Sequence, residues 1–197
     1  MKNTLYVVII IVLALFGLLC GTGCSKYNSM ISLQNEVESA WSNVETQYQR
    51  RAELIPNLVE TVKGYATHES TTLQAVTEAR AKVGSITLNV DSLSEESLKQ
   101  YTQAQNQLSG AMKSLLAVSE AYPELKANEN FLRFQDEYTG TENRIQYART
   151  EYNDIAREYN TEIATFPNNI FAGFFGFRKK PYFSAAEGAE VAPTVKF

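Results

Sequence analysis

The feature that most constrains the fold of this chain is a spacing of three or four residues between successive apolar side chains. Such a spacing places these side chains on one face of an α-helix, as in a coiled coil, where they pack against neighbouring helices. It runs through residues 30–83, 101–122 and 131–166. Between residues 26 and 166 glycine and proline are scarce whereas Ala, Leu, Glu and Gln are common, which favours helix over sheet. We therefore predict an all-α protein, an elongated antiparallel up-and-down helical bundle.

Loop-forming residues mark where the predicted helices end. Glycine, serine, asparagine and aspartate occur in residues 84–91, and Ser92 followed by Glu95 resembles a capping box at the start of the next helix. Pro123 ends the second apolar series and Pro167 the third, because proline cannot continue the hydrogen bonding of a helix. The bundle domain is therefore expected to occupy residues 26–167.

Pro56 leaves the number of helices open. A proline inside a helix removes a hydrogen bond, but proline is also favoured at the first position of a new helix. The apolar spacing crosses Pro56 without a break and no glycine lies beside it, which favours three rods with the first kinked at Pro56. The lengths favour a turn and four helices, because residues 29–83 as one rod would span about 80 Å and the second helix is too short to match it. Both solutions stay open at this point.

Residues 1–25 form a predicted membrane anchor or signal segment. No charged side chain occurs in residues 3–25, and such a stretch fits either a membrane-spanning helix of about 20 residues or a secretion signal. Lys2 precedes the stretch and Lys26 follows it. Together with the amino terminus, these charges favour an N-terminus in the cytoplasm, so that a single anchor at the cell membrane holds the body outside the cytoplasm.

Cys24 offers a second mode of anchoring. Signals of bacterial lipoproteins end in small residues before a cysteine that is lipidated. Thr22 and Gly23 fit that pattern, whereas Gly21 stands where leucine is usual. Lipidation of Cys24 and an uncleaved membrane helix are therefore alternatives, and either would anchor the protein.

The charge and the reactive side chains argue against several classes of function. The net charge is −4, with acids and bases interspersed, which is unlike a nucleic-acid-binding surface. Cys20 and Cys24 both belong to the N-terminal segment and His68 is the only histidine, so the body cannot assemble the usual zinc or di-metal ligand sets. No phosphate-binding loop or nucleophile elbow occurs. We predict that the protein is not an enzyme and has no catalytic residue, metal or cofactor.

Charged residues interrupt the apolar spacing. Arg51, Glu69 and Arg80 occupy positions on the apolar face, where an unpaired charge is costly. We predict that they join charged residues of the last helix in a polar bundle network that fixes the register of the helices. The alternative is a docking site for a partner protein. The residues of this candidate network are Arg51, Glu69, Arg80, Glu142, Arg144 and Arg149.

Two Tyr-Asn pairs lie one heptad apart, Tyr152 with Asn153 and Tyr159 with Asn160. Both tyrosines fall on the apolar face. We predict that they are core residues whose hydroxyl groups find hydrogen-bond partners. The asparagines are expected to bond across to a neighbouring helix.

Residues 168–183 form an aromatic C-terminal segment that carries basic residues at 178–180. Such a segment can lie at a membrane interface or cap the apolar end of a bundle, and we favour the cap. Four helices would return the segment to the membrane-proximal end, whereas three rods would leave it on the distal side. Residues 184–197 are small and polar, which predicts a disordered tail. The candidate interface aromatics are Phe171, Phe174, Phe175 and Phe177.

Several motifs resemble those of the LemA family of bacterial membrane proteins. They are Ala40-Trp41, Arg50-Arg51 with Leu-Ile-Pro-Asn-Leu-Val at 54–59, Val-Lys-Gly-Tyr-Ala at 62–66, Glu-Ala-Tyr-Pro-Glu-Leu-Lys-Ala at 120–127 and Thr-Glu-Asn-Arg-Ile at 141–145. The resemblance covers nearly the whole chain. It implies a single N-terminal membrane segment, a helical bundle domain and no known catalytic activity. The cysteines at the anchor depart from the commonest N-terminus of the family.

Together these features predict a membrane-anchored helical interaction or scaffold protein of the bacterial cell envelope. Its expected partner is another envelope or membrane protein, with self-association as a further expectation and no nucleic acid. The alternative is a structural protein directed at lipids or the membrane surface through its anchor and its aromatic segment.

Overall fold

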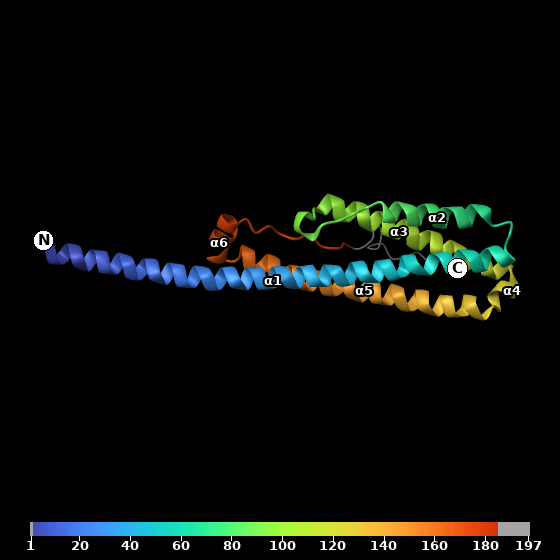
Figure 1. Cartoon of the computed structure of the whole chain (residues 1–197), viewed down its shortest axis with the longest axis horizontal. Helices are drawn as coiled ribbons and strands as arrows, with labels where there is room; N and C mark the ends of the chain where they lie inside the picture. The colour runs from blue at the N-terminus through green and yellow to red at the C-terminus, as the bar shows by residue number, and fades with distance from the viewer. Residues whose placement is uncertain (1, 185–197) are drawn as a thin grey trace, which may run out of the picture. The chain divides into compact units, whose positions relative to one another are not determined.

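Helices account for most of the residues that the structure, a computed structural model, describes (Figure 1). The described residues are 2–184, and within 2–24 the side-chain environment is described only at positions 6, 10 and 23. The predicted tail from residue 185 onward and the side chain of Cys24, the predicted lipidation site, lie outside the described residues. The α-helices are α1 Lys2–Tyr65, α2 Ser70–Gly84, α3 Glu95–Val118, α4 Pro123–Lys126, α5 Glu129–Ala164 and α6 Asn168–Phe175, with 3-10 turns η1 at Val90–Ser92 and η2 at Ser119–Ala121.

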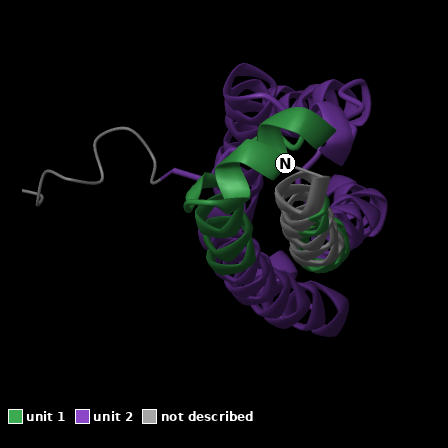
Figure 2. Ribbon diagram, turned by 90° about the vertical axis from the view of Figure 1, so that its left-hand side faces the viewer, with its two compact units in different colours: residues 1–40, 154–180 green, residues 41–153, 181–197 purple. Residues whose placement is uncertain are grey.

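The chain divides into two compact units, which are described here one at a time (Figure 2). Unit 1 consists of residues 1–40 and 154–180, and unit 2 consists of residues 41–153 and 181–197. Helices α1 and α5 each contribute residues to both units. The prediction of an all-α protein is confirmed for the described part of the chain.

Helix α1 passes through Pro56 without a turn, but it does not continue to residue 83 as the apolar spacing predicted. It ends at Tyr65, and residues 66–69 turn the chain into α2. The prediction of a single rod over residues 29–83 is therefore wrong. The apolar spacing gives no sign of this turn, because Val62, Ala66 and Leu73 belong to the same core although the turn separates the first from the last. Thr67 and His68 are weak helix formers that supply the turn.

In unit 2, helices α1 and α5 run antiparallel (Figure 1). The side chain of Asn43 donates to Glu151 at 3.1 Å, Arg51 donates to Glu142 at 2.7 Å, and Asn128, just before α5, donates to Tyr65 at 3.0 Å. The residue numbers of the partners on and beside α5 thus decrease as those on α1 increase, as two antiparallel helices require. Helix α2 packs against α3, where Lys82 donates to Gln107 at 2.8 Å. The expected turn at Pro56, on which the four-helix alternative rested, does not occur either, because the chain reverses at residues 66–69 instead.

The apolar core of unit 2 draws on each of these helices, and burial of this kind is the main favourable contribution to folding. Leu58, Met112 and Phe131 are each at most 1% exposed. The short helix α4 closes the end of the core with Leu125, which is fully buried. The principal members of the cluster are Ile55, Leu58, Val62, Val76, Leu108, Met112, Leu115, Leu125, Phe131 and Phe134.

The N-cap of helix α3 lies two residues after the expected cap at Ser92. Ser94 is the N-cap, its hydroxyl accepting the backbone N–H of Ser97 at 3.1 Å while the Ser97 hydroxyl accepts the N–H of Ser94 at 3.0 Å. The expected pairing of Ser92 with Glu95 is therefore wrong. Ser92 instead lies in a 3-10 turn that Asn89 caps by accepting the N–H of Asp91 at 2.8 Å. Glu95 and Glu96 still stabilise the first turn of α3 through its helix dipole.

In unit 1, helix α6 packs against α1 where the uncharged N-terminal run of residues 3–25 ends. A methyl group built on Gly23 would lie 3.1 Å from the ring of Phe171, so the helix backbone and this ring are in close contact. Lys26 and Glu162 form a partly exposed ion pair at 3.7 Å. Among the residues that the structure describes, none of the helices is both long and apolar enough to span a membrane.

Candidate functional site

A buried polar cluster centred on Arg51 joins three helices of unit 2. Its guanidinium donates from Nη1 to Glu142 Oε1 on α5 at 2.7 Å and from Nη2 to the Gln105 carbonyl on α3 at 3.1 Å. Nη2 also donates to the side-chain oxygen of Gln105. Ser109 donates to the second oxygen of Glu142 at 3.3 Å and lies 3.2 Å from the hydroxyl of Tyr138. Arg51 is only 2% exposed, and these bonds satisfy both of its terminal nitrogens. Its Nε and the Gln105 Nε2 are buried without a hydrogen-bond partner among the described residues.

Tyrosines surround this cluster. Burial raises the pKa of Tyr48, although the nearby charges of Arg149 and Arg51 oppose that rise. Burial also raises the pKa of Tyr101 to about 12 and raises the pKa of Tyr138. These hydroxyl groups consequently stay protonated at neutral pH, so they can act as hydrogen-bond donors around the cluster.

The other four residues of the predicted network lie outside this cluster or at its edge. Glu69, at the turn before α2, accepts from the Tyr122 hydroxyl at 3.3 Å, and the exposed Arg80 donates to the Ala52 carbonyl at 3.2 Å. Arg144 is also exposed and donates to the Thr141 hydroxyl at 3.2 Å. The structure thus brings Arg51 and Glu142 together, places Arg149 beside Tyr48 at the edge of that cluster, and leaves Glu69, Arg80 and Arg144 outside it.

Sequence reasoning did not assign Gln105, Ser109 or Tyr138 to this cluster. The signal was present for Gln105, because a glutamine in the middle of an apolar face needs a buried partner. Ser109 offered no such signal, since it lies beside the apolar face and contacts Glu142 only through the packing of α3 on α5.

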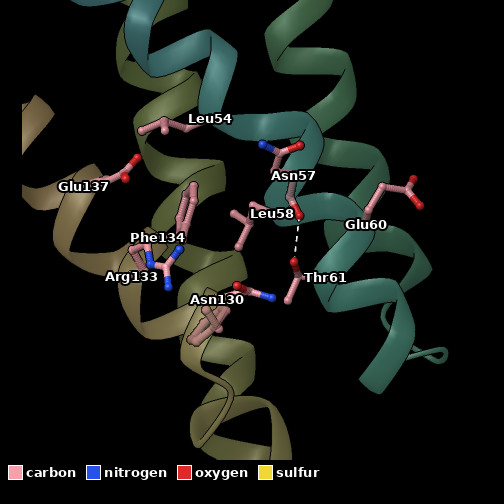
Figure 3. A pocket seen from close by; sticks show the side chains of 10 residues that line it. Leu54, Asn57, Leu58, Glu60, Thr61, Asn130, Arg133, Phe134 and Glu137 are labelled. Carbon is pink, nitrogen blue, oxygen red and sulfur yellow. Dashed lines mark hydrogen bonds between the residues drawn. The ribbon is translucent and has the colours of Figure 1, made fainter.

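A groove between α1 and α5 opens on the surface of unit 2 (Figure 3). We call it the α1/α5 groove; its volume is about 470 Å³. Its apolar side chains are Leu54, Leu58, Phe131 and Phe134, and polar side chains from both helices surround them. The hydroxyl of Thr61 donates to the Asn57 carbonyl at 2.8 Å, so it is held by its own helix. The polar lining residues are Asn57, Glu60, Thr61, Asn130, Arg133 and Glu137.

An exposed apolar surface lies on and beside α6 in unit 1. Phe166, Ile170, Phe174 and Phe175 are 76%, 61%, 82% and 48% exposed, and we call them the α6 surface. Tyr27 holds this helix on α1, with its ring 4.8 Å from that of Phe175 and 5.8 Å from that of Phe177.

The four predicted interface aromatics therefore have two kinds of environment. Phe171 and Phe177 are half-buried against α1, whereas Phe174 and Phe175 are exposed. The segment returns to α1 at Gly23 and Tyr27, where the uncharged run of residues 3–25 ends.

The two asparagines of the Tyr-Asn pairs bind the backbone of the C-terminal segment. In unit 1, Asn160 accepts the N–H of Lys180 and donates to its carbonyl, both at 2.8 Å. In unit 2, Asn153 makes the same two bonds with Phe183, again both at 2.8 Å. The expectation that these asparagines bond across to a neighbouring helix is wrong, because the C-terminal segment takes that position.

The side chain of Phe183 fills an aromatic site in unit 2 and is 6% exposed. Its ring stacks on Trp41 at 5.9 Å and 11°, and meets Tyr152 edge-on at 5.4 Å. The guanidinium of Arg149 lies 4.8 Å from its centre and donates to the Ser184 carbonyl at 3.1 Å. Tyr152 is fully buried and its hydroxyl donates to the Pro181 carbonyl at 3.1 Å, so burial raises its pKa. We call Trp41, Arg149, Tyr152 and Asn153 the Phe183 site.

The part of the chain that the structure describes contains no group of three or more His, Cys, Asp or Glu side chains able to hold a metal ion. His68 is exposed in the turn between α1 and α2.

Comparison with known proteins finds similarity along most of the chain. The model of the LemA family matches residues 40–197. Protein LemA of Metamycoplasma hominis is 30% identical over 162 residues, which cover 82% of this chain and 70% of that protein. Magnetosome protein MamQ 2 of Paramagnetospirillum magneticum is 26% identical over 175 residues, which cover 80% of this chain and 64% of that protein. Magnetosome protein MamQ of Magnetospirillum gryphiswaldense is 25% identical over 175 residues with the same coverage. This chain therefore spans less than two thirds of the length of these MamQ proteins.

Proposed function

Because this chain belongs to the LemA family, we propose that it is a membrane-anchored helical interaction protein, a scaffold of the bacterial cell envelope. In this proposal residues 1–25 anchor the chain at the cell membrane and the helical body lies outside the cytoplasm. Another envelope or membrane protein binds the body, and the chain itself carries out no catalytic step.

The observation that carries this proposal is the α1/α5 groove. Its apolar side chains come from two antiparallel helices. Leu58, Phe131 and Phe134 are at most 8% exposed and belong to the core beneath the groove, so Leu54, which is half-buried, and the polar lining residues supply its accessible surface. An amphipathic helix can lay its apolar face into such a groove. Glu60 on α1 and Arg133 and Glu137 on α5 give the groove charges of both signs, which would orient a bound partner.

Site-specific crosslinking in intact cells tests this proposal. A photo-crosslinking amino acid replaces Asn130, an exposed residue that lines the groove, in the full-length chain. Tyr147, which is on the same helix and 69% exposed, provides the matched control position. We expect a reproducible crosslinked protein from position 130 that position 147 does not capture. Equal capture from both positions, or none from either, would contradict a partner in the groove.

A second candidate function, contact with the lipid surface, is favoured by the α6 surface. Large apolar side chains on a short helix are costly in water but suit the boundary between lipid headgroups and acyl chains. The α6 surface lies beside Gly23 and Tyr27, where the apolar run of residues 3–25 ends. If that run is the anchor, this position is level with the membrane interface, where aromatic residues are enriched.

Tryptophan quenching in vesicles separates this candidate from the first. Trp41 is the only tryptophan, so a Trp41→Phe chain carrying Phe174→Trp has a single reporter on the α6 surface. We expect brominated lipids to quench that reporter in the full-length reconstituted protein, while Tyr147→Trp in the same background stays unquenched. If the two reporters respond alike, the α6 surface is not in contact with lipid.

A further inference from the structure

We propose that the Phe183 site is a binding site for an extended peptide segment and that it accepts the C-terminal segment of a second copy of this chain. In the structure the site holds the chain's own segment. Exchange of that segment between two copies would link them without any new kind of contact. Such exchange of an identical element is a low-cost route to a dimer. This exchange uses only the Phe183 site; neither the α1/α5 groove nor the α6 surface takes part in it.

The site recognises its occupant largely through the backbone. Asn153 satisfies both the N–H and the carbonyl of Phe183, and Tyr152 and Arg149 donate to the carbonyls of Pro181 and Ser184. Backbone groups of Pro181, Phe183 and Ser184 are thus bound by helix side chains, much as a neighbouring strand binds backbone groups. Residues 177–184 form neither helix nor strand, so the occupant keeps an extended form that a second copy can present equally well.

One side chain gives this recognition its specificity. The Phe183 ring is enclosed by Trp41, Tyr152 and Arg149, which combine stacking, edge-on and cation–π contacts. Neighbouring Tyr182 is 47% exposed. The site therefore selects an aromatic ring at the position of Phe183.

Two features favour release of the chain's own segment. Gly176 has a φ of +79°, a left-handed conformation that glycine adopts without strain, and it lies between α6 and the bound segment. Within the site, the indole N–H of Trp41 is buried with no hydrogen-bond partner among the described residues. A buried donor left unsatisfied lowers the stability of the closed site, so opening costs less than the full set of contacts suggests.

Complementing variants of the full-length chain test this exchange. The first variant, Phe183→Ala, has an intact site and a defective segment, whereas the second, Asn153→Ala with Arg149→Ala, has an intact segment and a defective site. Each is made with two different affinity tags, and tagged pairs are coexpressed and purified in detergent. We expect the mixture of the two variants to copurify, and each variant mixed with itself to lose copurification. Wild-type pairs and Tyr182→Ala pairs, as matched controls, should copurify.

Trp41 provides a second readout that does not depend on the tags, because it is the only tryptophan. Its emission should shift to longer wavelength in Phe183→Ala alone and return when the second variant is added. If Trp41 shifts but the two variants copurify no better than either variant with itself, the segment binds only within its own chain and the proposal is overturned. If Phe183→Ala leaves both readouts unchanged, the site does not recognise Phe183 and the proposal is likewise overturned.

Discussion

Arg51 Nη1 lies 2.7 Å from Glu142 Oε1, an ion pair between residues that are 91 positions apart in the chain. The Arg51 side chain is 3% exposed and that of Glu142 is 30% exposed, so the pair lies at the edge of the core with its positive end inside. Gln105 holds the same guanidinium from α3. One arginine therefore sets the relative positions of α1, α3 and α5 in unit 2, at the desolvation cost that any buried charge carries.

Removal of the carboxylate of this pair should destabilise the fold more than removal of an exposed one. Glu142→Ala leaves Arg51 buried without its counter-charge, and we expect a loss of about 2–4 kcal/mol in the free energy of unfolding, measured by urea denaturation. Asp154→Ala is the matched control, because it breaks an exposed pair with Arg157 at 2.9 Å and should change little. Equal effects of the two substitutions would mean that the Arg51 pair does not hold the helices together.

The buried tyrosines predict a loss of stability at alkaline pH. Burial raises the pKa of Tyr101 from 10.0 to about 12, so the folded state holds this proton more tightly than the unfolded state. The stabilisation is then complete below pH 10.0 and is lost as the pH rises toward 12. We expect the free energy of unfolding to fall over that window, and to fall less steeply in Tyr101→Phe. Parallel curves for the two proteins would show that Tyr101 does not titrate with folding.

The hydrogen bonds between Asn160 and the Lys180 backbone should protect the neighbouring residues of the C-terminal segment from proteolysis. Its amide group binds both backbone groups of Lys180 at 2.8 Å, which keeps the preceding basic residues close to α5 in unit 1. We expect Asn160→Ala to accelerate tryptic cleavage after Arg178 and Lys179, as followed by mass spectrometry of the intact chain. Asn169→Ala, at an exposed position on α6, is the control. Cleavage at the same rate in both variants would show that Asn160 does not restrain this segment.

The all-α class and the core positions could be predicted from sequence because the apolar spacing reports which side chains face a core. Leu58, Met112 and Tyr152 lie on predicted apolar faces and are all buried. The turn at residues 66–69 could not be predicted in the same way. A helix that continues and a helix that folds back can both keep Val62 and Leu73 on the core side, so the spacing is the same in the two cases.

The candidate sites were less predictable because they depend on contacts between distant segments. Arg51 and Glu142 could be selected as charges that need partners, and Gln105 carried the same signal. Asn153 did not, since an asparagine beside the apolar face has many ways to be satisfied and its partner, the backbone of Phe183, has no sequence signature. A backbone partner of this kind becomes visible only when the path of the C-terminal segment is known.

The start of α3 allows a test in which the structure and the sequence pattern predict different outcomes. The pattern places the cap at Ser92, whereas the structure places it at Ser94, whose hydroxyl accepts the N–H of Ser97 at 3.1 Å. Loss of an N-cap serine costs about 1 kcal/mol because a backbone N–H at the helix start loses its acceptor. We therefore expect Ser94→Ala to lower the free energy of unfolding by about that amount. Ser92→Ala, whose hydroxyl makes only a 3.4 Å contact with the Asn89 carbonyl, should have a much smaller effect. Urea denaturation of the two variants measures both losses in the free energy of unfolding. A larger loss in Ser92→Ala than in Ser94→Ala would show that α3 is capped at Ser92, as the sequence pattern predicts.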